Sequence, residues 1–127
     1  MKRFKAILLF ITLLIPQSGQ AANYDISSVG GLTLACQNIL DAEAGKKYDD
    51  RSYGLCFGYI RGVKNSYDIR RKAGAGAGGN ICAPSNITWL AYIKSFVNWS
   101  RKNPKMQNKM AWTGVVKSLS ETYPCSN

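Results

Sequence analysis

The sequence contains no histidine, and it has only seven acidic residues against 17 lysines and arginines. Without histidine, the usual base that activates a serine or cysteine nucleophile is missing, and so is the commonest metal ligand. Asp49 and Asp50 are the one adjacent carboxylate pair, but their polar surroundings are more typical of a solvated turn than of an acid–base dyad. We therefore expect no catalytic residue, no metal and no cofactor, and predict that the chain is not an enzyme.

A long apolar run is also missing, since the stretch from Ala6 to Ile15 is too short to span a bilayer. Basic residues precede this stretch, Pro16 ends it, and Gly19-Gln20-Ala21 supplies small residues at a cleavage site. The pattern predicts a secretory signal peptide over residues 1–21, cleaved near Ala21. We expect a single domain over residues 22–127, with no membrane span after cleavage.

Alternating strand patterns of useful length are absent, and four segments instead repeat their apolar residues at the helical period. Short connections between such segments predict an all-α fold, a small antiparallel bundle of about four helices. The expected helices cover about Val29–Ala44, about Tyr53–Lys72, the residues from just after Pro84 to about Lys102, and about Lys105–Thr122.

Helix-end signals accompany these segments. Ser28 is a suitable N-cap for the first helix, and Gly45 can end it in the left-handed conformation. For the third helix, Ser85 or Asn86 is the expected N-cap.

Three aromatic residues and two glycines carry further expectations. Trp112 should face inward, whereas Tyr92 and Trp99 lie at the polar margin of their helix, where an exposed ring could anchor a partner. Gly58 and Gly62 form a G-x-x-x-G step that permits close approach of a neighbouring helix. Tight packing inside the domain is favoured there over a dimer seam.

The four cysteines are Cys36, Cys56, Cys82 and Cys125. An even number in an exported chain suggests two disulfides, and the absence of a C-x₂₋₄-C pair argues against zinc. Spacing alone allows three pairings. In an antiparallel bundle, however, the start of the third helix lies beside the end of the fourth, which favours Cys82–Cys125 and leaves Cys36–Cys56.

A glycine-rich stretch follows the basic end of the second expected helix. Gly74, Gly76 and Gly79 match the G-x-G-x-x-G template for dinucleotide binding, but no strand precedes the stretch and no helix opens directly after it. A flexible connector is therefore favoured over a nucleotide site. Because such a connector loses much entropy on ordering, its expected function is a contact that orders on binding.

The positive charge is spread along the chain rather than gathered on one expected helix face. A solvated surface is the simplest account, followed by attraction to an acidic protein or an anionic envelope polymer. An exported protein rarely meets nucleic acid, so no nucleic-acid partner is expected.

The cysteine frame and its neighbouring motifs resemble a known family. "CFGYIRGV" surrounds Cys56, Pro84 follows Cys82 before an aromatic helix, Asn103-Pro104 breaks the chain, and "LSETYPC" closes at Cys125. Over essentially the whole mature chain this resembles the Rap/Tai immunity proteins, which protect bacteria against peptidoglycan amidases delivered by type VI secretion. The resemblance implies a periplasmic all-α protein, often dimeric, that binds an amidase and blocks its active-site cleft without catalysis of its own.

An inhibitor of such a cleft needs a narrow protruding element. The segment from Ala73 to Asn80 is the best candidate, and the preceding basic residues would guide it towards an acidic rim. A merely solvated helix end is an equally weighted alternative for those basic residues. The expected partner-binding residues are Arg70, Arg71, Lys72, Gly74, Gly76, Gly78, Gly79 and Asn80.

Two other functions remain open. A small periplasmic helical stress chaperone would be expected to switch at low pH, and the lack of histidine disfavours it. An inhibitor of another envelope hydrolase, such as a lysozyme, needs the same rigid scaffold and complementary surface as amidase immunity, so the sequence does not separate the two.

Overall fold

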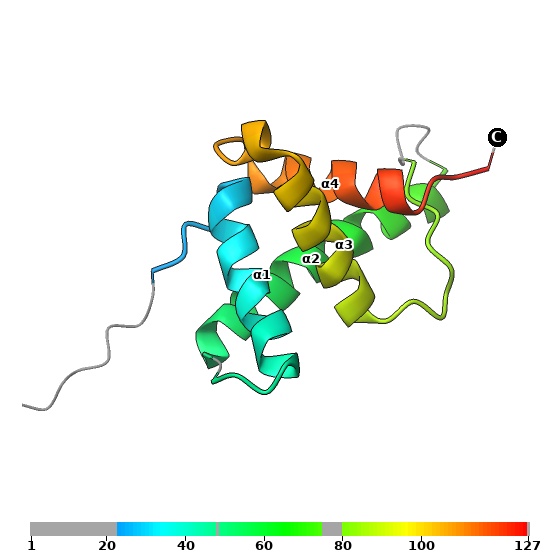
Figure 1. The fold of residues 1–127 in the computed structure, drawn as a ribbon. Coiled ribbons are helices and arrows are strands. Elements are labelled where there is room, and N and C mark those ends of the chain that lie inside the picture. Colours follow the sequence, from blue (N-terminus) through cyan, green and yellow to red (C-terminus); the bar gives the residue numbers. More distant parts are fainter. Residues whose placement is uncertain (1–22, 48, 75–79, 127) are drawn as a thin grey trace, which may run out of the picture.

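The structure, a computed structural model, describes residues 23–47, 49–74 and 80–126. The expected signal peptide lies outside these residues and stays a prediction. Within the described residues the chain forms helices and no named strand, which confirms the all-α fold (Figure 1). The helices are α1 (Val29–Glu43), α2 (Asp50–Lys72), α3 (Trp89–Lys102), the 3₁₀ turn η1 (Pro104–Met106) and α4 (Ala111–Thr122).

The core forms where the four α-helices meet. α1 packs mainly against α2, α3 packs mainly against α4, and α1 also contacts α3 and α4. Leu32, Ile60, Phe96, Val115 and Leu119 are fully buried at this junction. Each such side chain contributes roughly 1.5–3 kcal/mol of hydrophobic burial, so these positions dominate the stability of the bundle.

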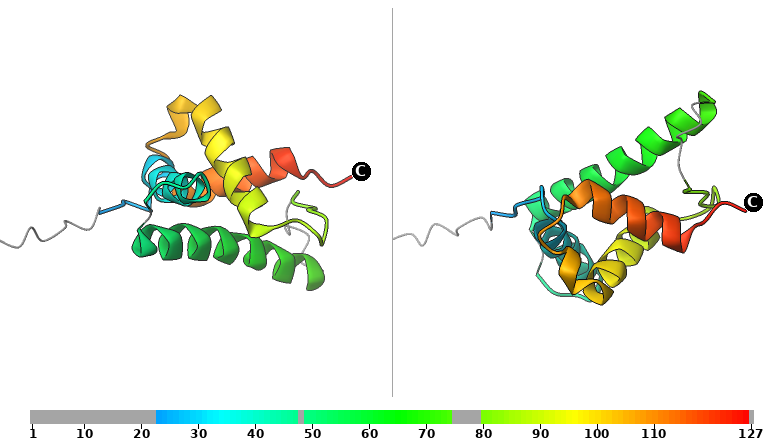
Figure 2. Two further views of the ribbon diagram at one scale, coloured as in Figure 1. Left: turned by 60° about the horizontal axis from the view of Figure 1, so that its bottom comes forward. Right: turned by 90° about the horizontal axis from the view of Figure 1, so that it is seen from above.

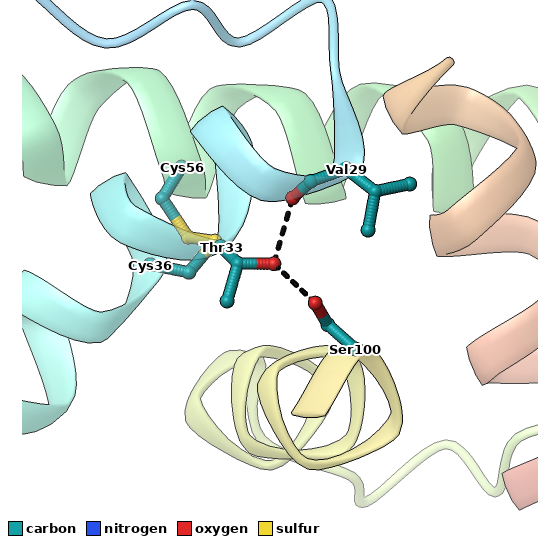
Figure 3. Close-up of a disulfide and its surroundings, with 5 residues drawn as sticks. All are labelled: Val29, Thr33, Cys36, Cys56 and Ser100. Atoms are coloured by element: carbon teal, nitrogen blue, oxygen red, sulfur yellow. Dashed lines mark hydrogen bonds between the residues drawn. A yellow bond between two sulfur atoms is a disulfide. The ribbon is translucent and has the colours of Figure 1, made fainter. Parts of the chain in front are cut away.

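A small polar cluster lies between α1 and α3. The Thr33 hydroxyl donates to the Val29 carbonyl at 2.7 Å and is also hydrogen-bonded to the Ser100 hydroxyl at 2.7 Å (Figure 3). The Gln107 amide donates to the Ser100 hydroxyl at 3.0 Å. Because Ser100 is fully buried, these bonds offset the cost of removing its hydroxyl from water.

Two helix ends lie where the sequence predicts them. The Ser28 hydroxyl accepts a hydrogen bond from the Gly31 N–H at 3.1 Å, which confirms Ser28 as the N-cap of α1. After α1, Gly45 has a φ of 81°, in the left-handed region that favours glycine.

Two other helix starts differ from the expectation. α2 begins earlier, because the Asp49 carboxylate accepts from two following backbone N–H groups and is the N-cap. This role accounts for Asp49 without catalysis. α3 is capped by Thr88 and not by Ser85 or Asn86, because Ile87 and Pro84 first form a turn.

The fourth helix begins at Ala111 and not near Lys105. The backbone before it serves α1 instead, since the Val29 N–H donates to the Lys109 carbonyl at 2.8 Å and the Gly30 N–H to the Gln107 carbonyl at 2.9 Å. The first N–H groups of a helix have no partner inside it, and these carbonyls supply one. A continuous helix from residue 105 would remove this contact.

Both favoured disulfide pairs are present. Cys36–Cys56 joins α1 to α2 with a Cα–Cα distance of 5.0 Å, and both cysteines are fully buried. Cys82–Cys125 joins the segment before α3 to the segment after α4, with a Cα–Cα distance of 4.8 Å, and it is partly exposed.

The expectation that Gly58 and Gly62 pack inside the domain is wrong. Both are exposed, and a Cβ atom on either would meet nothing within 4 Å. α2 buries its opposite face, including Ile60, and this leaves the glycines turned outward. Close helix packing instead occurs at Gly114, where a Cβ would lie 2.6 Å from a methyl group of Val29.

The exposure of three aromatic residues is also reversed. Tyr92 is 5% exposed and Trp99 is 8% exposed, so neither offers a free ring at the surface. The Trp99 indole N–H donates to the Glu121 carboxylate at 2.8 Å. Trp112 is 42% exposed, because α4 buries the face that carries Ala111, Val115 and Leu119. The Tyr67 ring contacts Trp112 at a centroid distance of 6.0 Å.

Candidate partner-binding site

The C-terminal end of α2 carries three consecutive basic residues, Arg70, Arg71 and Lys72, all exposed. Positive charge is favourable there because it faces the negative end of the helix dipole. Ala73 caps the helix, and Gly74 turns the chain with a φ of 66°. This end of α2 extends past the neighbouring helices (Figure 2), which leaves it accessible to a partner.

The glycine-rich segment is described at its two flanks. Gly74 and Asn80 are both exposed, whereas Gly76, Gly78 and Gly79 lie outside the described residues. The partner-binding role expected for these glycines stays a prediction.

Immediately after Asn80, the chain is fixed to the bundle. Ile81 is 2% exposed, and the Cys82 N–H donates to the Tyr123 carbonyl at 2.8 Å. The disulfide from Cys82 to Cys125 adds a covalent link, and the Arg71 guanidinium donates to the Cys82 sulfur at 3.6 Å. The far end of the glycine-rich segment is thus held beside the basic end of α2.

A cavity of about 350 Å³ lies between the C-terminal half of α2 and residues 83–89; we call it the basic pocket. Three of its charged lining residues form a chain, in which the Asp68 carboxylate pairs with Lys64 and also with Arg71, the latter at 3.6 Å. Lys64 is 7% exposed and its ammonium lies 5.8 Å from the centroid of the Tyr92 ring. Burial, together with the charges of Tyr123 and Asp68, raises the pKa of Tyr92.

A row of aromatic rings forms the wall between α2 and α3. The Tyr53 ring stacks on Phe57, and Phe57 meets Trp89 edge to face. The ring centroids of Trp89 and Tyr92 lie 5.3 Å apart. The Arg61 guanidinium lies 5.8 Å from the Phe57 ring centroid and 5.9 Å from that of Trp89. Cation–π contacts of this kind hold the start of α3, and therefore the wall of the basic pocket, against α2.

A second and more apolar cavity, of about 610 Å³, lies beside the start of α4. Ile26, Tyr59, Met110 and Trp112 line it, and Met110 is 66% exposed. Burial raises the pKa of the Tyr59 hydroxyl, against a weaker lowering by its hydrogen bond to the Trp112 backbone. Sequence patterns missed this surface because the helical period placed Trp112 in the core.

The described residues hold no group of three or more cysteine, aspartate, glutamate or histidine side chains that could bind a metal ion. None of their helices is long and apolar enough to cross a membrane. What they do present is an exposed basic helix end, a charged pocket and an apolar cavity on a disulfide-linked helical scaffold. The described part of the chain is thus a small, disulfide-linked helical domain with three accessible surface features.

The family model for Rap1a immunity proteins matches residues 28–125, and the chain belongs to this family. The matched range contains all four α-helices, both disulfides and the basic pocket. No curated protein and no solved structure gave a significant match to the chain. Membership of this family indicates that the chain is an immunity protein for a secreted effector. That effector is its binding partner.

Proposed function

We propose that the protein acts in the periplasm, where it binds a peptidoglycan amidase delivered by type VI secretion and blocks its active-site cleft. The match to the immunity family over residues 28–125 is the observation that carries this proposal. Two disulfides favour an oxidising compartment, which agrees with the signal peptide predicted from the sequence. The motifs around Cys56 and Cys125 support an amidase as the target, because the resemblance rests on them.

In this mechanism the segment from Ala73 to Asn80 enters the cleft. Its flanks are exposed, and the Cys82 disulfide fixes its far end, which limits the entropy lost when a partner orders it. Arg70, Arg71 and Lys72 attract an acidic cleft rim and raise the association rate. The protein inhibits by occupying the cleft and needs no chemistry of its own.

The test compares amidase inhibition by the intact protein with inhibition by two variants of residues 74–79. One variant shortens the stretch, and a matched variant keeps its length but replaces every second residue with serine. We expect the shortened variant to lose at least about tenfold in inhibition, because even a small displacement of a positioned element is costly. The measurement is release of peptide from peptidoglycan, with melting temperature and intact disulfides as fold controls.

Three outcomes would count against parts of the proposal. Unchanged inhibition by the well-folded shortened variant would remove the segment from the mechanism. Failure to bind any amidase, with binding to a lysozyme instead, would move the function to another envelope hydrolase. Retention of unfolded client proteins at acidic pH would favour the chaperone.

A homodimer is the further partner that the resemblance implies. We assign it to the outward face of α2, where Gly58 and Gly62 permit close approach of a second helix and meet no other part of the described chain. Sedimentation equilibrium of the intact protein and of a Gly58→Leu/Gly62→Leu variant tests this. A monomer at all concentrations would overturn the assignment.

A further inference from the structure

We propose that the basic pocket receives the carboxylate of one acidic side chain of the effector. This inference rests on the proposed function in one respect, that the chain binds an effector. It adds a defined anchor, separate from the glycine-rich segment, and the chemistry of the group that fills it.

The pocket has the size and construction of a recognition site. Its volume of about 350 Å³ falls within the roughly 300–1,000 Å³ that is usual for ligand pockets. One wall comes from α2, and the other comes from Pro84, Ile87 and Trp89. A few polar groups facing apolar walls fix the orientation of a bound group and strengthen its electrostatic interactions.

The charges of the pocket favour a negatively charged group. Lys64, Arg71 and Lys72 line it against one carboxylate, Asp68, so its formal charge is positive by two units. Asp68 already pairs with Lys64 and Arg71, whereas no ion pair of Lys72 is found among the described residues. An incoming carboxylate would lower this excess from two units to one and could pair with Lys72.

Arg71 is positioned before the carboxylate arrives. Its guanidinium is held by Asp68 on one side, at 3.6 Å, and by the Cys82 sulfur on the other, at 3.6 Å. A guanidinium has five N–H donors, so these two contacts leave donors for a further partner. Asn65 lines the same pocket and offers its side-chain amide. A fixed arginine loses little rotamer entropy on binding, which favours affinity.

The matched variants for the test come from two cavities of this chain. Asn65→Asp with Lys72→Gln lowers the formal charge of the basic pocket by two units, and among the described residues neither side chain belongs to the core or forms an ion pair. Asn98→Asp with Lys102→Gln makes the same two changes in a separate cavity beside Trp99. Both pairs of residues are exposed, so both variants are expected to fold.

Affinity for the cognate effector is measured by calorimetry at two salt concentrations. We expect the basic-pocket variant to bind about tenfold or more weakly and with a smaller salt dependence, while the control variant binds like the intact protein. Equal affinity of all three proteins would overturn the inference. An equal loss in both variants would also overturn it, because the effect would then be general attraction.

A small probe separates this inference from the proposed function. Acetylglutamate amide is titrated into the intact protein, and the Arg71 side-chain signals are followed by NMR, with acetylglutamine amide as the neutral control. Shifts caused by the charged probe alone, and lost in the Asn65→Asp/Lys72→Gln variant, would support a carboxylate pocket even if the effector proved not to be an amidase. Absence of such shifts at millimolar probe would overturn the pocket.

Discussion

At the scale of single residues, the glycines of this chain fall into two physical classes. A Cβ atom at Gly31 would lie 1.9 Å from the Asp25 carbonyl oxygen, a backbone atom that cannot move without shifting the chain before α1. At Gly58 a Cβ would meet nothing within 4 Å. The same substitution should therefore have opposite effects at the two positions.

Gly31→Ala is expected to lower the free energy of unfolding by about 3 kcal/mol, because the start of α1 must move away from residue 25. Gly58→Ala should raise it by roughly 0.5–1 kcal/mol, because alanine costs less conformational entropy in a helix than glycine. Urea unfolding followed by circular dichroism measures both. Destabilisation by Gly58→Ala in a dilute, monomeric sample would contradict the packing described for α2.

The sequence predicted those residue properties that depend on composition or on local bonding. The absence of histidine, the Ser28 cap and the turn at Gly45 all follow from the chain itself. Lys64 and Trp112 could not be placed from the sequence, because a lysine on a helix is normally exposed and a tryptophan normally buried. Asp68 pairs with Lys64 one turn along α2, whereas Tyr92 meets it only when α3 packs against α2.

At the scale of elements, the two disulfides differ in their access to a reductant. Cys36–Cys56 is fully buried, whereas Cys82–Cys125 is partly exposed and has the Arg71 guanidinium 3.6 Å from Cys82. A nearby positive charge stabilises the thiolate that leaves when a disulfide is attacked. Attack by an external thiolate on Cys125 would release Cys82 in that favourable position.

We therefore expect mild dithiothreitol to open Cys82–Cys125 well before Cys36–Cys56, as measured by alkylation and mass spectrometry. A Cys82→Ser/Cys125→Ser variant should keep its helices but lose about 3 kcal/mol of stability and much of its affinity for the effector, because one wall of the basic pocket is released. Arg71→Gln should slow the opening. Simultaneous reduction of both disulfides would contradict the difference in burial.

The sequence predicted the ends of helices that are set by a local signal. It missed the ends that are set by a tertiary contact. The apolar period placed all four α-helices. The start of α4 moved from about Lys105 to Ala111 because the carbonyls of Gln107 and Lys109 bind the first N–H groups of α1. That contact joins segments about eighty residues apart, so the spacing of apolar residues within one helix does not predict it.

At the scale of the whole molecule, the missing histidine determines how stability responds to pH. Hydrogen bonds from Ser27 lower the pKa of Asp25, and hydrogen bonds from Gln37 and Lys46 lower the pKa of Asp41. A carboxyl whose pKa is lower in the folded state stabilises the fold above its unfolded pKa of about 3.9. This contribution disappears as the pH falls through the folded pKa.

The melting temperature should consequently change little between about pH 5 and 8, where no side chain of ordinary pKa titrates, and should fall below about pH 4. Thermal scans by circular dichroism across this range measure it. A sharp transition near pH 6 would contradict this expectation, and exposure of apolar surface at that pH would support the acid-activated chaperone.

The general architecture was more predictable than the binding surfaces. Helical periodicity, cysteine count and antiparallel geometry were sufficient for an all-α fold with the pairs Cys36–Cys56 and Cys82–Cys125. The basic pocket needs α2, residues 83–89 and α3 to meet at one place, and the apolar cavity needs α4 to start late. Such surfaces depend on where elements pack, which is a property of the folded molecule.

The separation of the paired cysteines along the chain also sets an order of assembly. A chain that emerges with its N-terminal end first can close Cys36–Cys56 once α1 and the start of α2 are available, since 20 positions separate these cysteines. Cys82 has to wait for Cys125, 43 positions later, by which time all four α-helices have emerged. The basic pocket is therefore among the last parts of the molecule to be completed, and a partly synthesised chain would lack the surface that we propose recognises the effector.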